Sequence, residues 1–208
     1  MDSKSTAKNQ TVKKIAFTGI MAAMASVLMF IEFPLIFIAP DFLKFDFSNL
    51  PALIISFIFG PIYGLAVVAV KSTVHLTATT SAGIGELADF ILGGVFVLTA
   101  GIIYKLKPTR KAALLGMLAA TILSSAAAAI LNYFFLIPFF ANYFIGAPIS
   151  VQEKIDIIID AFSKIIPIID NLFKAVIFSV VPFNLIKGIV ISLITFFVYK
   201  RLSKIFKK

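Results

Sequence analysis

Apolar stretches of about twenty residues recur along this 208-residue chain, and they constrain its fold more than any other feature. Four are long enough to cross the hydrocarbon core of a bilayer as helices: residues 15–33, 86–104, 112–141 and 182–199. A fifth, residues 51–70, is interrupted by Gly60 and Pro61. Because 60% of the residues are hydrophobic and only 14% are charged, a soluble domain of this size could not bury the apolar surface. We therefore expect an all-α membrane protein.

The interruption at Gly60 and Pro61 allows two counts of spans, and the basic residues decide between them. Five spans result if residues 51–70 form one kinked helix, and six if they divide into about 47–59 and 61–77. With five spans, the basic loop at 105–111 and the basic tail could not both share a side with the N-terminus. Cytoplasmic loops are enriched in Lys and Arg, so we predict six transmembrane helices with both termini cytoplasmic.

This topology accounts for the net charge of +9 without a nucleic-acid partner. It places thirteen of the nineteen basic residues on the cytoplasmic side: Lys4, Lys8, Lys13, Lys14, Lys105, Lys107, Arg110, Lys111, Lys200, Arg201, Lys204, Lys207 and Lys208. The excess of positive charge is then a marker of orientation in the membrane.

We expect one membrane domain, residues 1–208, whose first 14 residues form a basic cytoplasmic tail and whose residues 143–181 form an extracellular connector. In that connector, Ile155, Ile159 and Phe162 recur at helical spacing opposite Asp156 and Asp160, which predicts an amphipathic helix on the outer membrane surface or capping the bundle. Two other outer segments stand out. Residues 32–47, the fold-back segment, are too apolar for a solvated hairpin and are expected to fold over the bundle. Residues 77–85, the polar loop, are small and polar.

Several chemistries are excluded by composition. The chain has no Cys and a single His, His75, so disulfides, thiolate metal sites and multi-histidine metal clusters cannot form. It has no Walker A motif, so it cannot hydrolyse ATP by that route. We predict no catalytic residue, no metal site and no cofactor. The sequence shows no convincing internal repeat, which argues against the inverted-repeat design of many secondary transporters.

A few polar residues lie within the predicted spans, near their outer ends: Asn132, Asn184, Lys187, Glu86 and Asp89. Such groups face a bundle interior or a cavity, and their clustering predicts a binding pocket open to the exterior. Alternatives remain open: Asn132 bonded to a neighbouring helix, the two acids solvated in a first helical turn, or Lys187 paired with one of them. Lys71 and His75, four residues apart, are interpreted as structural or interfacial.

Small residues form a stripe on the first predicted helix, as Gly19-xxx-Ala23 and Ala22-xxx-Ser26. Small residues permit another helix to approach closely. The stripe serves either to dock a partner helix or to pack within the bundle.

Five motifs, in this order, carry a resemblance to a known family: FLKFDFSNLPALI (42–54), FGPIYG (59–64), GIGELADF (83–90), LNYF (131–134) and PFNLIKG (182–188). From about Ile15 to Tyr199 the chain resembles the riboflavin-specific substrate-binding subunits, or S components of RibU type, of bacterial energy-coupling factor (ECF) transporters. The connector at 143–181 looks longer than is usual in that family.

The resemblance implies a non-enzymatic vitamin-uptake subunit of the bacterial cell membrane, which works with a transmembrane coupling subunit and two ATPase subunits. It implies that Asn132, Asn184 and Lys187 hydrogen-bond riboflavin. It also implies that residues of the two outer segments help to enclose the vitamin: Phe42, Leu43, Lys44, Phe45, Asp46, Gly85 and Glu86. The stripe of Gly19, Ala22, Ala23 and Ser26 is similar to the surface that docks the coupling subunit.

Two kinds of alternative stay open. Within the same transporter type, flavin mononucleotide or another vitamin is the main alternative ligand, although a lone Lys187 without a nearby Arg disfavours a phosphate site. From a different class, the alternatives are a membrane-embedded enzyme and a stand-alone secondary transporter.

Overall fold

The computed structural model describes the backbone of residues 3–206 and the side chains of residues 9–199. Of the basic residues assigned to the cytoplasmic side, Lys207 and Lys208 lie outside the described residues, as do the side chains of Lys4, Lys8, Lys200, Arg201 and Lys204. The first half of the chain contains α1 (Ser3–Phe30), β1 (Phe33–Pro34), β2 (Lys44–Phe45), α2 (Asn49–Phe59), α3 (Pro61–His75), η1 (Leu76–Ala78) and α4 (Ile84–Leu106). The second half contains α5 (Arg110–Leu131), η2 (Asn132–Leu136), α6 (Ile137–Phe144), α7 (Val151–Ser163), α8 (Leu172–Ala175), η3 (Val176–Val180) and α9 (Val181–Phe206).

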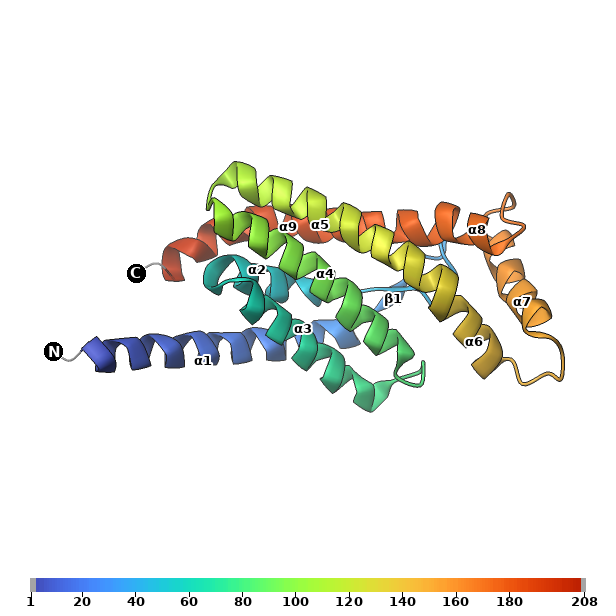
Figure 1. The fold of residues 1–208 in the computed structure, drawn as a ribbon, viewed down its shortest axis with the longest axis horizontal. Helices are drawn as coiled ribbons and strands as arrows, with labels where there is room; N and C mark the ends of the chain where they lie inside the picture. The colour runs from blue at the N-terminus through green and yellow to red at the C-terminus, as the bar shows by residue number, and fades with distance from the viewer. Residues whose placement is uncertain (1–2, 207–208) are drawn as a thin grey trace.

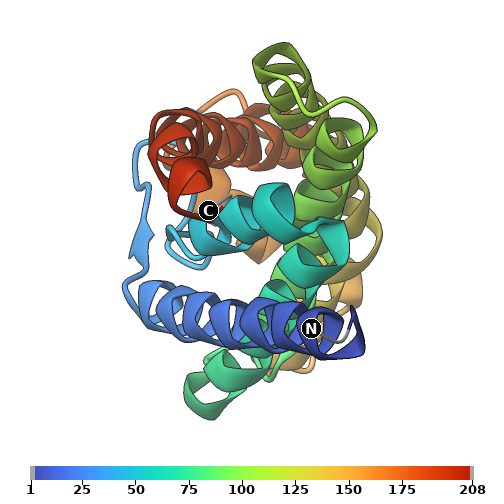
Figure 2. The same cartoon turned by 90° about the vertical axis from the view of Figure 1, so that its left-hand side faces the viewer.

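Five helical segments of the described chain are long and apolar enough to cross a membrane: Asn9–Phe30, Pro61–Ala78, Ile84–Leu106, Arg110–Phe144 and Leu172–Tyr199. The expected all-α membrane architecture is therefore present. These segments alone do not confirm the expected count of six spans, because the remaining apolar helix, α2, has only 11 residues, about half the length of a full span. α2 is instead surrounded by the other helices (Figure 2), with most of its residues buried among α1, α3, α4 and α9.

The division between α2 and α3 lies at Gly60 and Pro61, as the sequence suggests. Gly60 has φ 111°, a conformation that residues with a Cβ rarely adopt. Pro61 starts α3, where the missing backbone N–H is not needed. The chain therefore reverses sharply here and forms two helices rather than one kinked one.

Two further boundaries differ from those expected. The helical segment expected at 112–141 runs from Arg110 to Phe144 without a break, and the last begins at Leu172, ten residues before its expected start at Pro182. Pro138 and Pro182 each follow a π-helical turn, η2 or η3. A proline lacks an N–H and its ring clashes with the carbonyl four residues earlier, and the wider π turn moves that carbonyl away. These prolines are thus accommodated inside long helices and do not begin them.

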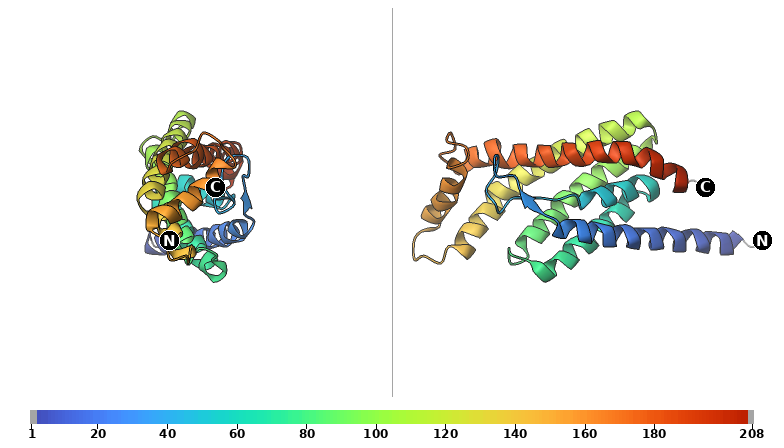
Figure 3. Two further views of the ribbon diagram at one scale, coloured as in Figure 1. Left: turned by 90° about the vertical axis from the view of Figure 1, so that its right-hand side faces the viewer. Right: turned by 180° about the vertical axis from the view of Figure 1, so that it is seen from behind.

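One end of the bundle is capped. Both termini lie at one end with the α4–α5 connection, and η1, α7 and the β1–β2 ladder lie towards the other (Figure 1). In that ladder Phe33 pairs with Phe45, so the fold-back segment returns over the bundle. It also lies against the last helix (Figure 3), where Ser179 donates a hydrogen bond to the carbonyl of Ile38 at 2.6 Å.

Helix α7 completes the capped end. Ser150 and Glu153 form a capping box at its start, and the helix ends at Ser163, before Pro167. Its buried residues Ile155, Ile159 and Phe162 pack into a cluster with residues of α6, α8 and η3. Its apolar face therefore covers the bundle, which is the second of the two positions that the sequence left open.

Candidate ligand-binding site

A cavity of about 460 Å³ lies in the capped half of the bundle, within the size range of small-molecule sites. Its wall is formed by the end of α1, the fold-back segment and side chains of α2 to α6 and α9. It brings together nine of the ten residues predicted to bind a ligand: Phe42, Leu43, Lys44, Asp46, Gly85, Glu86, Asn132, Asn184 and Lys187.

Phe45 is the exception, and the local strand geometry explains why. Successive side chains of a strand point to opposite faces, and Lys44, its neighbour in β2, faces the cavity. Phe45 is only 3% exposed, is not part of the cavity lining, and packs with Ala39 and with Phe183 behind the wall. The structure therefore does not place Phe45 at the cavity, and its packing anchors the fold-back segment.

The two asparagines have matching geometry beside the two π turns. The Nδ2 of Asn132 donates to the carbonyl of Ala128 at 2.9 Å, and the Nδ2 of Asn184 donates to that of Val180 at 2.9 Å. Each bond is made within the asparagine's own helical segment and not to a neighbouring helix. Each Oδ1 is then available as an acceptor in the cavity wall.

Lys187 forms an ion pair across the cavity wall. Its Nζ lies 2.7 Å from Oδ2 of Asp46, rather than pairing with Glu86 or Asp89. The backbone N–H of Ser48 donates to Asp46 Oδ1 at 2.7 Å, and the Ser48 hydroxyl donates to the same oxygen. Burial alone would raise the pKa of Asp46, but the nearby charges of Lys187 and Lys71 lower it below its ordinary value. The fold-back segment is thus tied to α9 by an ionised carboxylate.

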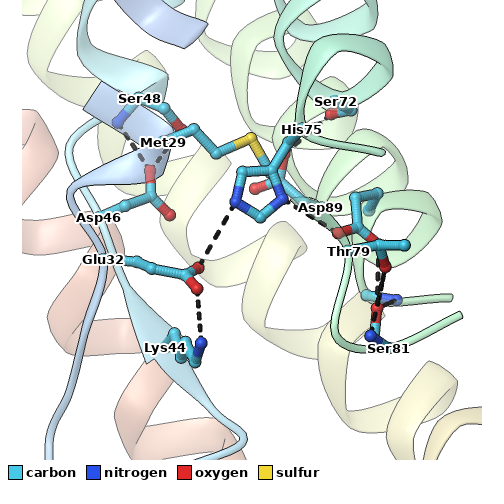
Figure 4. A network of polar contacts seen from close by, with 12 residues as sticks. Met29, Glu32, Lys44, Asp46, Ser48, Ser72, His75, Thr79, Ser81 and Asp89 are labelled. Carbon is cyan, nitrogen blue, oxygen red and sulfur yellow. Dashed lines mark hydrogen bonds and ion pairs between the residues drawn. The ribbon is translucent and has the colours of Figure 1, made fainter. Parts of the chain in front are cut away.

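Lys71 is fully buried directly behind this pair. It donates to Oγ of Ser48 at 2.8 Å and forms an ion pair with Asp89, which also accepts from Ser72 at 3.0 Å. Figure 4 shows Ser48, Ser72 and Asp89 in this part of the network. The structure therefore supports a structural role for Lys71, since it holds the residue that in turn holds Asp46.

His75 links the two outer segments. Its Nδ1 lies 3.0 Å from Glu86 and its Nε2 lies 4.0 Å from Glu32, which in turn pairs with Lys44 at 2.5 Å. The ring lies between the fold-back segment and the polar loop (Figure 4). Glu86 also accepts hydrogen bonds at 2.9 Å from Thr79 and from Ser81. At 4% exposure, it is not the solvated first-turn residue that one alternative proposed.

Asn49 is a cavity residue that the sequence analysis did not single out. It is 8% exposed, lines the cavity, and its Oδ1 is buried without a hydrogen-bond partner in the described part of the chain. An unsatisfied buried acceptor is unfavourable unless a ligand or water supplies a donor. The sequence did contain a signal that could have identified Asn49. It is an amide residue that follows Ser48 and stands directly before the apolar run that begins at Leu50.

Replacing Asn49 with leucine, which has a similar shape, is expected to change stability and binding in opposite directions. Removing the unsatisfied acceptor should raise the free energy of unfolding of the empty protein by about 1 kcal/mol, while ligand affinity falls about tenfold. Thermal melting and ligand titration of the same preparation check this. A variant with unchanged affinity would show that Asn49 does not contact the ligand.

The small-residue stripe on α1 divides into two faces. Gly19 and Ala23 are exposed, and a Cβ added at Gly19 would meet nothing within 4 Å. Ala22 and Ser26 are buried in the bundle, where the Ser26 hydroxyl donates to the carbonyl of Ala22 at 2.9 Å. Ala22 and Ser26 are thus covered within this chain, and Gly19 and Ala23 remain as an exposed small surface.

Comparison with known proteins identifies the family. Residues 13–199 match the family described as ECF transporter, substrate-specific component. The chain belongs to this family. It is 35% identical over 199 residues to the riboflavin transporter RibU of Staphylococcus aureus (strain TCH60), covering 96% of this chain and 95% of that protein. It is 31% identical over 195 residues to the riboflavin transporter FmnP of Bacillus subtilis (strain 168), covering 92% and 93%.

A solved structure agrees with this assignment. The fold matches the S component of a bacterial ECF transporter with a TM-score of 0.71 and 33% sequence identity, over 95% of this chain and 99% of that one. The chain is accordingly a substrate-specific transporter component and not an enzyme.

Proposed function

We propose that this S component binds riboflavin in the cavity at its capped end. One observation supports this most directly: a largely apolar cavity presents Asn132, Asn184 and Lys187 together. Riboflavin combines a planar, mostly apolar ring with a polar edge of carbonyls and ring nitrogens. Amide oxygens accept from the single ring N–H, at N3, or from a ribityl hydroxyl, and an ammonium donates to a carbonyl or a ribityl hydroxyl. The relatives reported above are named riboflavin transporters.

The apolar wall suits the ring of such a ligand. Leu92, Phe96, Ile137 and Phe140 line the cavity from α4 and α6, and burying the ring against them supplies non-directional affinity. The polar contacts contribute about 1–3 kcal/mol each, mainly as discrimination, because a ligand that leaves a buried partner unmatched is penalised.

The proposed orientation in a bacterial cell membrane places the cavity outside. Both termini lie together at the end away from the cap (Figure 1), and the basic residues at 105–111 lie in the connection at that end. Positive-inside enrichment therefore supports cytoplasmic termini. With α2 counted as a short sixth transmembrane helix inside the bundle, the topology is the one predicted from the charges.

A vitamin panel tests the proposed ligand. The purified chain is melted in detergent with riboflavin, thiamine, biotin or no addition, since a ligand that binds the folded state raises the melting temperature by mass action. Riboflavin should stabilise the chain at micromolar concentration and the other vitamins should not. Stabilisation by another vitamin but not by riboflavin would contradict the proposal.

We also propose that this chain delivers riboflavin with a coupling subunit and two ATPase subunits, and that Gly19 and Ala23 form the docking surface for the coupling subunit. Both residues are exposed on α1 next to large apolar side chains such as Ile20 and Val27. Small residues on an apolar helix face allow the backbone of another helix to approach.

Replacing Ala23 with leucine is expected to abolish most riboflavin uptake while leaving riboflavin affinity unchanged. The larger side chain projects from the bundle and obstructs only an approaching helix. The matched control is Ala126→Leu, since Ala126 is also exposed but lies on α5. Uptake by membranes that contain all subunits, together with titration of the isolated chain, checks the prediction. Equal uptake by the two variants would remove Ala23 from the docking surface.

A further inference from the structure

The charges around the cavity are almost fully paired. Among the side chains described for residues 9–199, two lysines line the cavity, Lys44 and Lys187. Lys44 pairs with Glu32 at 2.5 Å and Lys187 with Asp46 at 2.7 Å. The cavity's ammonium groups are therefore already neutralised before a ligand enters.

The remaining charges add no free cation. Asp89 lines the cavity and pairs with Lys71, which lies behind the wall, and Glu86 pairs with His75. In total, the four carboxylates of Glu32, Asp46, Glu86 and Asp89 are paired with three lysines and one imidazole. Within the described part of the chain no arginine lines the cavity, and Arg110 is exposed at the far end of α5.

A phosphate monoester would be poorly accommodated by this wall. It carries a charge of about −1.5 to −2 at neutral pH, and burying a charge without a partner is strongly unfavourable. Proteins bind phosphate groups through unpaired Arg or Lys side chains or through helix N-termini. The N-termini of α2 and α4, which border the cavity at Asn49 and Gly85, already have the carboxylates of Asp46 and Glu86 beside them. A neutral polyhydroxy chain needs no such partner.

We propose that the cavity selects uncharged riboflavin over its phosphate ester, flavin mononucleotide, and that Asp46 sets this selectivity by neutralising Lys187. The inference rests on the proposed function, because it concerns two forms of that ligand. Asp46 is 4% exposed and is fixed by the backbone and hydroxyl of Ser48. It therefore cannot swing away to release Lys187 when an anion approaches.

The test compares two dissociation constants, for riboflavin and for flavin mononucleotide, in the whole chain in detergent. We expect the natural chain to bind the phosphate ester at least about tenfold more weakly. Asp46→Asn keeps the shape and an acceptor for Ser48 but frees the charge of Lys187, so the ratio of the two constants should shift at least about tenfold towards the ester.

Two control variants separate this effect from a general loss of negative charge or of fit. Asp89→Asn removes a carboxylate from the same wall but frees Lys71, which does not line the cavity. It should therefore shift the ratio much less than Asp46→Asn. Asp46→Glu retains the charge and should keep the natural ratio. A natural chain that binds both flavins equally, or an Asp46→Asn ratio equal to the natural one, would overturn the proposal.

A measurement on the natural chain keeps the proposal falsifiable if the variants do not fold. A neutral ester at the ribityl 5′ position, similar in size to the phosphate, should bind more tightly than flavin mononucleotide. If the two esters bound equally weakly, the size of the substituent and not its charge would determine the selectivity, and the proposal would be overturned. A natural chain that binds neither riboflavin nor its esters contradicts the proposed function itself.

Discussion

Replacing Lys187 with methionine is expected to lower riboflavin affinity about a hundredfold or more and to destabilise the fold. One ammonium donor is used by Asp46, and a lysine has two more to offer a ligand. The substitution removes these and leaves Asp46 buried without its partner, which costs about 3–5 kcal/mol when a buried pair is broken on one side. Riboflavin titration and thermal melting measure the two effects separately.

The double variant Asp46→Asn with Lys187→Met distinguishes the two effects. It removes both charges, so most of the lost stability should return while the affinity stays low. A non-additive effect on stability is the signature of a direct pair. If Lys187→Met bound riboflavin as tightly as the natural chain, Lys187 would have no role in binding.

Replacing Lys71 with methionine is expected to reduce the free energy of unfolding by about 3–5 kcal/mol. Lys71 is fully buried, and its removal leaves Asp89 without its counter-charge and Ser48 without a donor. Thermal or denaturant melting in detergent checks this. Adding Asp89→Asn should restore much of the stability, because the unpaired charge is then gone.

Lys44→Met is the matched control for this prediction. Lys44 also pairs with a carboxylate, Glu32, but its side chain is 35% exposed, and exposed pairs contribute at most about 1 kcal/mol. If Lys71→Met were no more destabilising than Lys44→Met, burial would not determine how much each ion pair contributes to the free energy of unfolding.

Local sequence signals predicted much of the fold. The lengths of the apolar stretches identified the five long helical segments of the described chain, and Gly60 with Pro61 located the division between α2 and α3. The start of the last helix was misplaced because the predicted segment began at Pro182, whereas the helical segment begins at Leu172. The π turn η3 accommodates Pro182 inside the helix, and nothing in the local sequence announces a π turn.

The residues of the candidate site were predictable by type, but their partners were not. Asn132, Asn184 and Lys187 line one cavity as expected from polar residues in apolar spans. Lys187, however, pairs with Asp46, which lies 141 positions earlier in the chain. Such a pair depends on where the fold-back segment crosses α9 in space. The spacing of residues along the chain does not reveal that position.

Residue spacing was also insufficient at two finer points. Five consecutive residues from Phe42 were assigned to the ligand as a group, but alternation along β2 turns Phe45 away from the cavity. On α1, the pairs Gly19 with Ala23 and Ala22 with Ser26 have the same spacing but opposite exposure. The orientation of a helix about its own axis decides this, and it is set by packing against α2 and α3.

Titration of riboflavin with the purified chain in detergent tests the central claim most directly. Isoalloxazine fluorescence should be quenched as the ring leaves water for the cavity, and it should saturate at one riboflavin per chain with submicromolar affinity. A folded chain that leaves riboflavin fluorescence unchanged at micromolar concentrations of both would contradict the account.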